Sequence, residues 1–305
     1  MAVIDDMKVV GGTGLTAQEK RGHKILIARR ILAYTVLILV CAIAILPFLM
    51  LLVNLTKDSA TLRSTFSLLP GDHFLANFQK VIDNAVGQTA SKPIFRAMLN
   101  SFMVASVTCL TSVYIATLTA YGLYAYDFRL KKAAFVFIMV ILMVPTQVSA
   151  LGYVDMVTKM GLYNTYIPLI FQSLAAPGVF FFIKQYMESS LPMEIVEAGR
   201  IDGGHEFYIF NFVVMPILKP AMAVQMIFQF VASWNNYFLP QLIMDNSSEN
   251  QTLPLLIASL ESEAYAMDLG QSYMSLGIAI IPVIIIYLCL SKFIIRGVAL
   301  GSVKG

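Results

Sequence analysis

Long uncharged stretches constrain this sequence more than any other feature. Charged residues make up 13% of the 305-residue chain and hydrophobic residues 58%, whereas a soluble domain has about 25% charged residues. So little polar surface cannot cover a water-soluble particle, and the apolar side chains must therefore meet lipid. The composition predicts a polytopic membrane protein.

Six apolar runs are long enough to cross a bilayer, which makes the predicted fold all-α with six transmembrane helices. About 20 residues of helix span the hydrocarbon core, because a helix rises about 1.5 Å per residue. The runs comprise residues 31–53, 97–123, 133–151, 165–182, 209–233 and 272–295. The first is too long for a cleavable signal and has no small-residue cleavage site after it. Prolines interrupt several runs, which packed membrane helices tolerate.

The positive residues predict how these spans are oriented. Six spans place both termini on one side, and an excess of Lys and Arg marks the cytoplasmic side. Fourteen of the 21 Lys and Arg residues fall on the side of the termini, six fall on the other, and Lys219 lies within a span. We therefore expect a cytoplasmic N-terminal segment 1–30, a first span 31–53, an extracytoplasmic loop 54–96, a core of five helices 97–295 and a cytoplasmic tail 296–305. Loop 54–96 either rests against a secreted protein or is only solvated.

Several classes of function lack support in the sequence. Cys41, Cys109 and Cys289 lie in separate apolar runs and are interpreted as buried spectators, and no His or Cys cluster has metal-ligand spacing. We therefore expect no metal, and the net charge of +3 does not suggest nucleic acid. The chain also lacks GxxxxGK[ST], so any ATP hydrolysis must come from a partner.

The cytoplasmic segment 189–208 has the features of a short helix between two spans. Pro192 suits the first turn of a helix, and Glu194 and Glu197 favour its N-terminal half. Gly203 and Gly204 can end the helix in a left-handed conformation. On these grounds alone, the segment is either a working element or an ordinary amphipathic connector on the membrane surface.

The residues of this segment resemble a family signature. Glu197-Ala198-Gly199, then Asp202-Gly203 and Met215-Pro216, are similar to the signature loop of ATP-binding-cassette (ABC) importer permeases. Further motifs resemble the oligosaccharide-permease branch, in particular the six-span partner of the maltose-type pair. They are Leu99-Asn100-Ser101, Pro145-Thr146-Gln147, Gly161-Leu162-Tyr163-Asn164-Thr165, Ser233-Trp234-Asn235-Asn236-Tyr237, Thr252-Leu253-Pro254 and Gly301-Ser302-Val303-Lys304-Gly305. The likeness covers roughly residues 96–305, with glycines at 199 and 204 where the family has alanine.

This resemblance implies a type I ABC importer fold, in a cytoplasmic membrane, with a cytoplasmic coupling helix that fits into a cleft of a separate ATPase. The ATPase-coupling residues would be Glu197, Ala198, Gly199, Asp202, Gly203 and Pro216, with Glu197 facing a basic residue of the ATPase. Implied partners are a second permease subunit that completes a heterodimer, an ABC ATPase dimer, an extracytoplasmic sugar-binding protein and membrane lipid. ATP and Mg would be bound by the ATPase, with no cofactor in this chain, and the cargo would be a sugar, most simply an oligosaccharide. The tail 299–305 would reach the ATPase interface.

A polar stripe on the fifth span is a possible solute path. Gln225, Gln229, Ser233 and Asn236 are offset by 0, 4, 8 and 11 residues, which places them on one helical face. Uncharged amides and hydroxyls suit a neutral hydroxylated solute, and Trp234 and Tyr237 could stack on sugar rings. The alternatives are polar contacts between helices for the stripe and an interfacial aromatic belt for the two rings.

The main rival interpretation is a secondary, ion-coupled transporter of a neutral solute. Such proteins bury ionisable residues at mid-membrane, whereas the two charged residues within the six predicted spans, Lys219 and Lys292, lie near the cytoplasmic boundary. The sequence therefore favours the importer permease.

Overall fold

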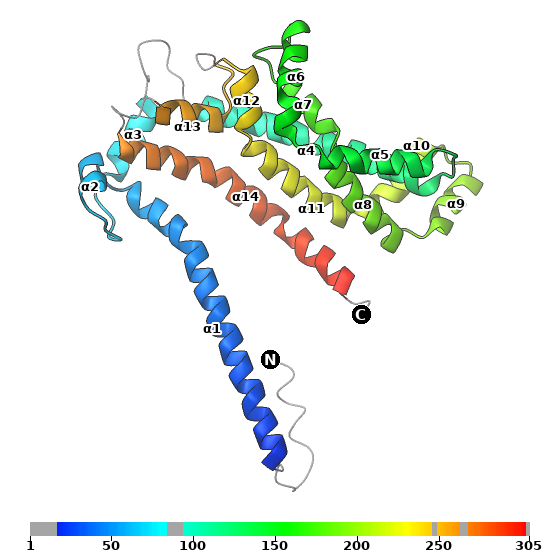
Figure 1. The fold of residues 1–305 in the computed structure, drawn as a ribbon, viewed down its shortest axis with the longest axis horizontal. Coiled ribbons are helices and arrows are strands. Elements are labelled where there is room, and N and C mark those ends of the chain that lie inside the picture. The colour runs from blue at the N-terminus through cyan, green and yellow to red at the C-terminus, as the bar shows by residue number, and fades with distance from the viewer. Residues whose placement is uncertain (1–16, 84–93, 246–248, 263–267, 303–305) are drawn as a thin grey trace. The chain divides into compact units, whose positions relative to one another are not determined.

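The structure is a computed structural model that describes residues 17–83, 94–245, 249–262 and 268–302, all of which form helices or loops without a strand (Figure 1). It divides into two units, residues 1–53 and 54–305, and each is described by itself. Within these described residues, four helices are long and apolar enough to cross a membrane, and two bent helix pairs raise the number to six if each pair is one span.

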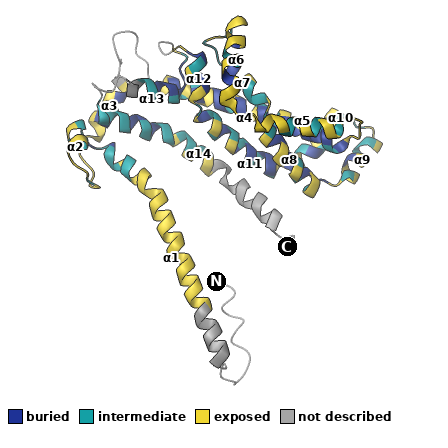
Figure 2. Cartoon of the chain, viewed as in Figure 1, coloured by how far each residue is buried: buried dark blue, intermediate teal, exposed yellow. Residues whose placement is uncertain are grey.

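The first unit consists of most of one long helix, α1 (Ala17–Asn54). The helix begins well before residue 31, where the first span was predicted, and its candidate spanning part is Leu26–Asn54. Every side chain from Leu26 to Leu49 is exposed, although nearly all are apolar (Figure 2). A helix that is apolar all round is stable only in an apolar environment, so this surface is suited to lipid.

In the second unit, α4 (Ile94–Ala125) is the central helix. It packs along α11 (Met215–Trp234) and α8 (Pro177–Ser190). Its buried face is rich in small residues: Ala97, Ser101, Ala105, Ser112, Ala116, Thr117 and Ala120. Small side chains let helix backbones approach closely, which is how helices associate in membranes without a hydrophobic driving force.

Two predicted spans are bent. The span expected at 133–151 consists of α5 (Lys131–Met143) and α6 (Thr146–Lys159), which meet at 95°. The span expected at 165–182 consists of α7 (Ile167–Leu174) and α8, which meet at 40°. Both bends precede a proline, because the residue before proline is forced out of the helical region. Val144 before Pro145 and Ala176 before Pro177 have extended or irregular backbones.

The second unit contains further helices and one π-helical segment. They are α2 (Ser59–Ser64), α3 (Phe74–Asp83), α9 (Met193–Ile201), α10 (Glu206–Tyr208), the π-helix at Ile209–Val214, α12 (Phe238–Ile243), α13 (Leu253–Ser262) and α14 (Leu269–Ser302). One end of α4 joins a core with residues of α3, α13 and α14, and the other end joins a core with residues of α8, α9 and the π-helix.

Around α2 and α3, polar contacts that range from buried at Asn77 to partly exposed at Lys80 and Asp268 form a unit that we call the clasp, made of Lys57, Ser59, Asn77, Lys80, Asp268 and Gly270. Asn77 Nδ2 donates to the backbone oxygens of Leu55 and Lys57, at 2.9 and 2.8 Å. Ser59 donates to Asp268 Oδ1 at 2.6 Å, and Lys80 pairs with the other carboxylate oxygen. Asp268 also accepts from the first amides of α14, so the clasp ties the segment after the first span to that helix.

Candidate coupling site

The short helix α9 forms where the sequence predicts it, and its two ends have local causes. Pro192 has an extended backbone directly before the helix, as expected for a proline at a helix start. Gly203 has a φ of +80°, a left-handed conformation that ends the helix, and its N–H donates to the Arg200 oxygen at 3.0 Å. Of these two glycines, Gly203 is the one with a positive φ, so the predicted left-handed stop belongs to Gly203 and not to Gly204.

Gly204 has a different reason to be glycine. A Cβ at this position would lie 2.9 Å from the Gly199 oxygen and 3.1 Å from Ile209 Cγ1. At Gly199 a Cβ would lie 3.3 Å from the same Ile209 atom. Both departures from the family pattern therefore let α9 approach the π-helix closely. We infer that the glycines give tight packing here rather than a loose helix.

One face of α9 is anchored and the other is free. Val196 is fully buried in the core that contains Ile209 and Phe210. Glu197 and Ala198 are exposed, as are Asp202 and Gly203, while Gly199 is half-buried. The predicted coupling residues on α9 and its terminus thus lie together with their acidic groups open to solvent. Pro216 lies apart from them, exposed in the first turn of α11.

An ion pair that the sequence analysis missed joins α9 to its neighbours. We call Tyr121, Tyr126, Arg200 and Glu206 the latch. Arg200 Nε donates to Glu206 Oε1 at 2.6 Å, and Tyr121 donates to Glu206 Oε2 at 2.8 Å. The Arg200 guanidinium also lies 3.5 Å from the Ala125 oxygen and 5.3 Å from the centre of the Tyr126 ring.

The electrostatics of the latch favour the charged state of Arg200. Its hydrogen bond to Glu206 raises the pKa of the guanidinium, more than its partial burial lowers it. The side chains of Arg200 and Glu206 are 32% and 38% exposed. In the sequence, the available signal was the pair of opposite charges, Arg200 and Glu206, on either side of the Gly203-Gly204 turn.

The residues of the predicted solute path on α11 and just after it are mostly buried or half-buried within this chain. Gln225 is 8% exposed, and among the described residues its amide has no hydrogen-bond partner. Gln229 and Ser233 are half-buried. Asn236 is also half-buried, and its Oδ1 accepts from the Leu239 amide at 3.4 Å, so part of its capacity serves the backbone.

The two aromatic residues considered for the path differ from each other. Trp234 is 2% exposed and stacks on Phe230 with ring centres 5.8 Å apart. Its ring is covered within this chain and belongs to a core that includes residues of α4 and α14. Tyr237 is 37% exposed and keeps a surface for contact with a ligand or an interface.

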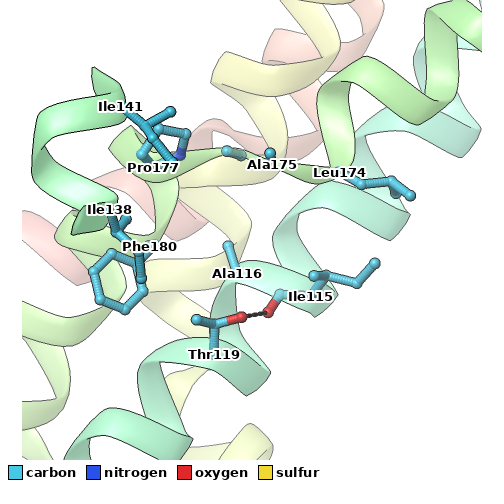
Figure 3. Close-up of a pocket in the computed structure, with 10 residues that line it drawn as sticks. Ile115, Ala116, Thr119, Ile138, Ile141, Leu174, Ala175, Pro177 and Phe180 are labelled. Atoms are coloured by element: carbon cyan, nitrogen blue, oxygen red, sulfur yellow. Dashed lines mark hydrogen bonds between the residues drawn. The ribbon is translucent and has the colours of Figure 1, made fainter. Parts of the chain in front are cut away.

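A cavity of about 400 Å³ lies beside the bend between α7 and α8 (Figure 3). It is lined by α4, α5 and the bend, with Ile115, Ile138 and Phe180 among its walls. The Thr119 hydroxyl, which is on its wall, donates to the Ile115 oxygen at 2.8 Å. Recognition of a sugar requires several placed polar groups, so this cavity is not suited to the solute. In the part of the chain that the structure describes, no group of His, Cys, Asp or Glu could hold a metal ion.

Bent spans around a central helix, with an exposed acidic helix between two spans, define a permease subunit of a binding-protein-dependent importer. The chain belongs to the family described as the binding-protein-dependent transport system inner membrane component, whose model matches residues 110–300. The arabinooligosaccharides transport system permease protein AraQ of Bacillus subtilis is 33% identical over 69% of this chain and 74% of its own length. The sn-glycerol-3-phosphate permease protein UgpE of Escherichia coli K12 is 28% identical over 88% of this chain and 95% of its own.

Solved structures agree on the fold. The crystal structure of a bacterial ABC transporter involved in the import of the acidic polysaccharide alginate superposes with a TM-score of 0.71, at 19% identity, over 92% of this chain and 100% of the other. The alginate ABC transporter in complex with a pentasaccharide-bound periplasmic protein gives a TM-score of 0.56 at 16% identity, over 87% and 94%. The chain is thus a membrane-embedded permease of an ABC transporter.

Proposed function

We propose that this permease imports a sugar, specifically an oligosaccharide, that an extracytoplasmic binding protein delivers. The observation that carries the proposal is the exposed acidic face of α9, at Glu197 and Ala198, within the segment that matches the importer family. An exposed carboxylate on a helix whose other face is anchored can be held by a second protein without disturbing the core. This is the arrangement that a coupling element needs.

The energy would come from a separate ABC ATPase dimer that binds ATP and Mg, because this chain lacks a phosphate-binding GxxxxGK[ST] loop. A second permease subunit would complete the path across the bilayer. The excess of Lys and Arg on the side of the termini supports cytoplasmic termini and a cytoplasmic α9. The site residues in this proposal are Glu197, Ala198, Gly199, Asp202 and Gly203, with Pro216 at the start of α11.

The proposed cargo is neutral. Gln225, Gln229 and Ser233 on α11 carry amide and hydroxyl groups, which give and accept hydrogen bonds without fixing a charge. The similarity to AraQ supports an oligosaccharide, whereas the similarity to UgpE offers a phosphate ester as the competing cargo. The sole charge in α11 is Lys219, which lies in its first turns rather than along the stripe, and this favours the neutral solute.

The test is uptake by the assembled importer in proteoliposomes, with binding protein outside and ATP inside. We expect arabino-oligosaccharide uptake, and no competition from sn-glycerol 3-phosphate. Glu197→Lys places a positive charge where the proposed partner is basic, so we expect uptake to fall at least about a hundredfold, as for the loss of a buried charge pair.

The matched control is Glu194→Lys, which makes the same charge change on an exposed residue of the same helix. We expect Glu194→Lys to keep most of the uptake. Wild-type uptake by Glu197→Lys, with normal amounts of the assembled complex, would contradict the proposed coupling role. Equal losses in both variants would assign the effect to the overall charge of α9 and not to Glu197.

A further inference from the structure

The latch connects three elements at one end of the second unit. Arg200 lies in the last turn of α9, Glu206 is the first residue of α10, and Tyr121 lies near the end of α4. The guanidinium donates to Glu206 and to the Ala125 oxygen, while its face lies over the Tyr126 ring. A guanidinium can bind several groups at once because its donors form a planar, rigid fork.

Glu206 serves as the second junction. Its Oε1 accepts from Arg200 and its Oε2 accepts from Tyr121. One carboxylate therefore links α9 to α4 through two charge-assisted hydrogen bonds, which are shorter and stronger than neutral ones. Glu206 also begins the candidate span Glu206–Trp234, so any displacement of Glu206 acts directly on that span.

The packing beneath the latch makes the connection stiff. Gly199 and Gly204 allow α9 to lie against Ile209, and Tyr121 packs on Phe210 with ring centres 5.4 Å apart. Ile209 and Phe210 are the first residues of the π-helix. Short π-helical segments inside α-helices are frequent at functional sites. The contacts of α9 thus converge on the segment where the span at Glu206–Trp234 departs from α-helical geometry.

We infer that Arg200 and Glu206 are positioning residues that make α9, the end of α4 and the π-helix move as one body, so that force on α9 is transmitted into both spans. This inference rests on the proposed coupling function of α9. Glu197 receives the force from the partner, and the latch determines which helices of this chain respond. Without the latch, α9 can still bind the ATPase, but it moves relative to α4.

The first test measures ATP hydrolysis and uptake in one preparation of the full importer. In Arg200→Ala and in Glu206→Ala, we expect binding-protein-stimulated ATP hydrolysis within about twofold of wild type and uptake reduced about tenfold, as for the loss of a charge-assisted hydrogen bond. The matched control is Glu188→Ala. It removes an ion pair to Lys184 that lies within α8 and joins no two elements, and we expect both rates to stay normal.

Rescue separates a positioning role from a general loss of stability. We expect Arg200→Lys, which keeps the charge but not the fork, to recover part of the uptake. We expect the double variant Arg200→Ala/Glu206→Ala to be about as impaired as either single one, because each single variant already removes the Arg200–Glu206 bond. A parallel fall of hydrolysis and uptake, or additive losses in the double variant, would overturn the inference. Where an alanine variant fails to assemble, the same ratio of uptake to hydrolysis is measured in Arg200→Lys and Glu206→Gln. A ratio below that of wild type supports the positioning role, and a wild-type ratio contradicts it.

A second test follows the movement itself. Spin labels at Ile201 on α9 and Leu118 on α4, both exposed, report the distance between the two helices in a chain whose three cysteines are replaced by alanine. We expect this distance to be the same in the nucleotide-free and nucleotide-trapped wild-type importer. We expect it to change and broaden on trapping in Arg200→Ala. A wild-type distance that changes as much as that of the variant would overturn the inference.

Glu197→Lys, measured in the same preparations, separates the two proposals. Normal uptake by Glu197→Lys means that the proposed function fails. Loss of uptake in Glu197→Lys together with normal uptake in Arg200→Ala means that the coupling role stands and the latch inference fails.

Discussion

The clasp and the latch use polar groups in opposite ways. In the clasp, Asn77 is fully buried and Lys57 is 4% exposed, and both bind backbone oxygens. In the latch, the two charged residues are about one third exposed and bind mainly each other. Buried polar groups without partners are costly, so the clasp resists opening, whereas the latch holds its geometry at a surface that another protein can reach. The comparison suggests that one end of the unit is fixed and the other is where movement begins.

The largest effect is expected from breaking the clasp. Asn77→Ala leaves two buried oxygens, those of Leu55 and Lys57, without their donors, which should destabilise the subunit by about 2–4 kcal/mol. The measurement is thermal unfolding in detergent, followed by a thiol-reactive dye on buried Cys109 after Cys41 and Cys289 are replaced by serine. The control is Leu75→Ala on the exposed side of α3. Equal unfolding temperatures for the two variants would contradict the proposed rigidity of the clasp.

Gly270 in the clasp and Gly204 beside the latch allow the two regions to be compared by the same substitution, glycine to alanine. Gly270→Ala would bring a Cβ to 2.6 Å from the Lys57 oxygen and 2.7 Å from the Asn77 amide. Asn77 is fully buried and the Lys57 oxygen belongs to the backbone, so neither can move easily away from the added Cβ. We therefore expect the free energy of unfolding to fall by about 1–3 kcal/mol, measured with the same dye. Gly122→Ala is the matched control, since its Cβ would meet nothing within 4 Å. A loss no greater than that of Gly122→Ala would show that the clasp adapts.

Gly204→Ala makes the corresponding change at the latch end, with a Cβ 2.9 Å from the Gly199 oxygen. We expect a smaller loss of stability, about 1 kcal/mol, because the adjacent turn is exposed and can shift. The same shift should displace Glu197, so uptake should fall more than the unfolding temperature suggests. Comparing uptake with dye labelling in one preparation checks this, and a loss of stability without a loss of uptake would contradict it.

The smallest effect concerns pH. Burial raises the pKa of the Asp268 carboxyl, but hydrogen bonds from Lys80 and Ser59 outweigh it and hold the pKa below its usual range. A carboxyl with a lowered folded-state pKa stabilises the protein above its unfolded pKa of about 4, and this contribution is lost as the pH falls through the folded-state pKa. We expect less than about 1 kcal/mol, since the side chain is partly exposed. Unfolding temperatures of wild type and Asp268→Asn should therefore converge as the pH falls below about 4, and a constant difference would contradict this assignment.

The features that the sequence predicted well depend on local chemistry. Pro192 and Gly203 set the limits of α9 through their own backbone preferences. The apolar runs indicate membrane-spanning helices by their length and composition. The family followed from motifs that stand in order along the chain. The coupling roles of Glu197 and its neighbours, and the orientation of the termini, remain predictions.

The features that the sequence did not reveal depend on distant contacts. Pro145 ends a helix, whereas Pro47, Pro220 and Pro282 lie inside helices, so the residue type alone could not separate a bend from a continuous span. Trp234 lies in the core because α4 and α14 cover it. No pattern in the sequence of loop 54–96 indicated that Asn77 donates hydrogen bonds to the backbone just after the first span.

The bend between α5 and α6 has a consequence for how this subunit exists in a bilayer. Met143, Val144 and Pro145 are exposed where the chain turns by 95°. Acyl chains offer no hydrogen bonds, and irregular backbone at membrane depth is tolerated only where protein or water solvates it. If the turn lies within the bilayer, its backbone cannot face lipid. A neighbouring polypeptide or an aqueous channel must then lie against it.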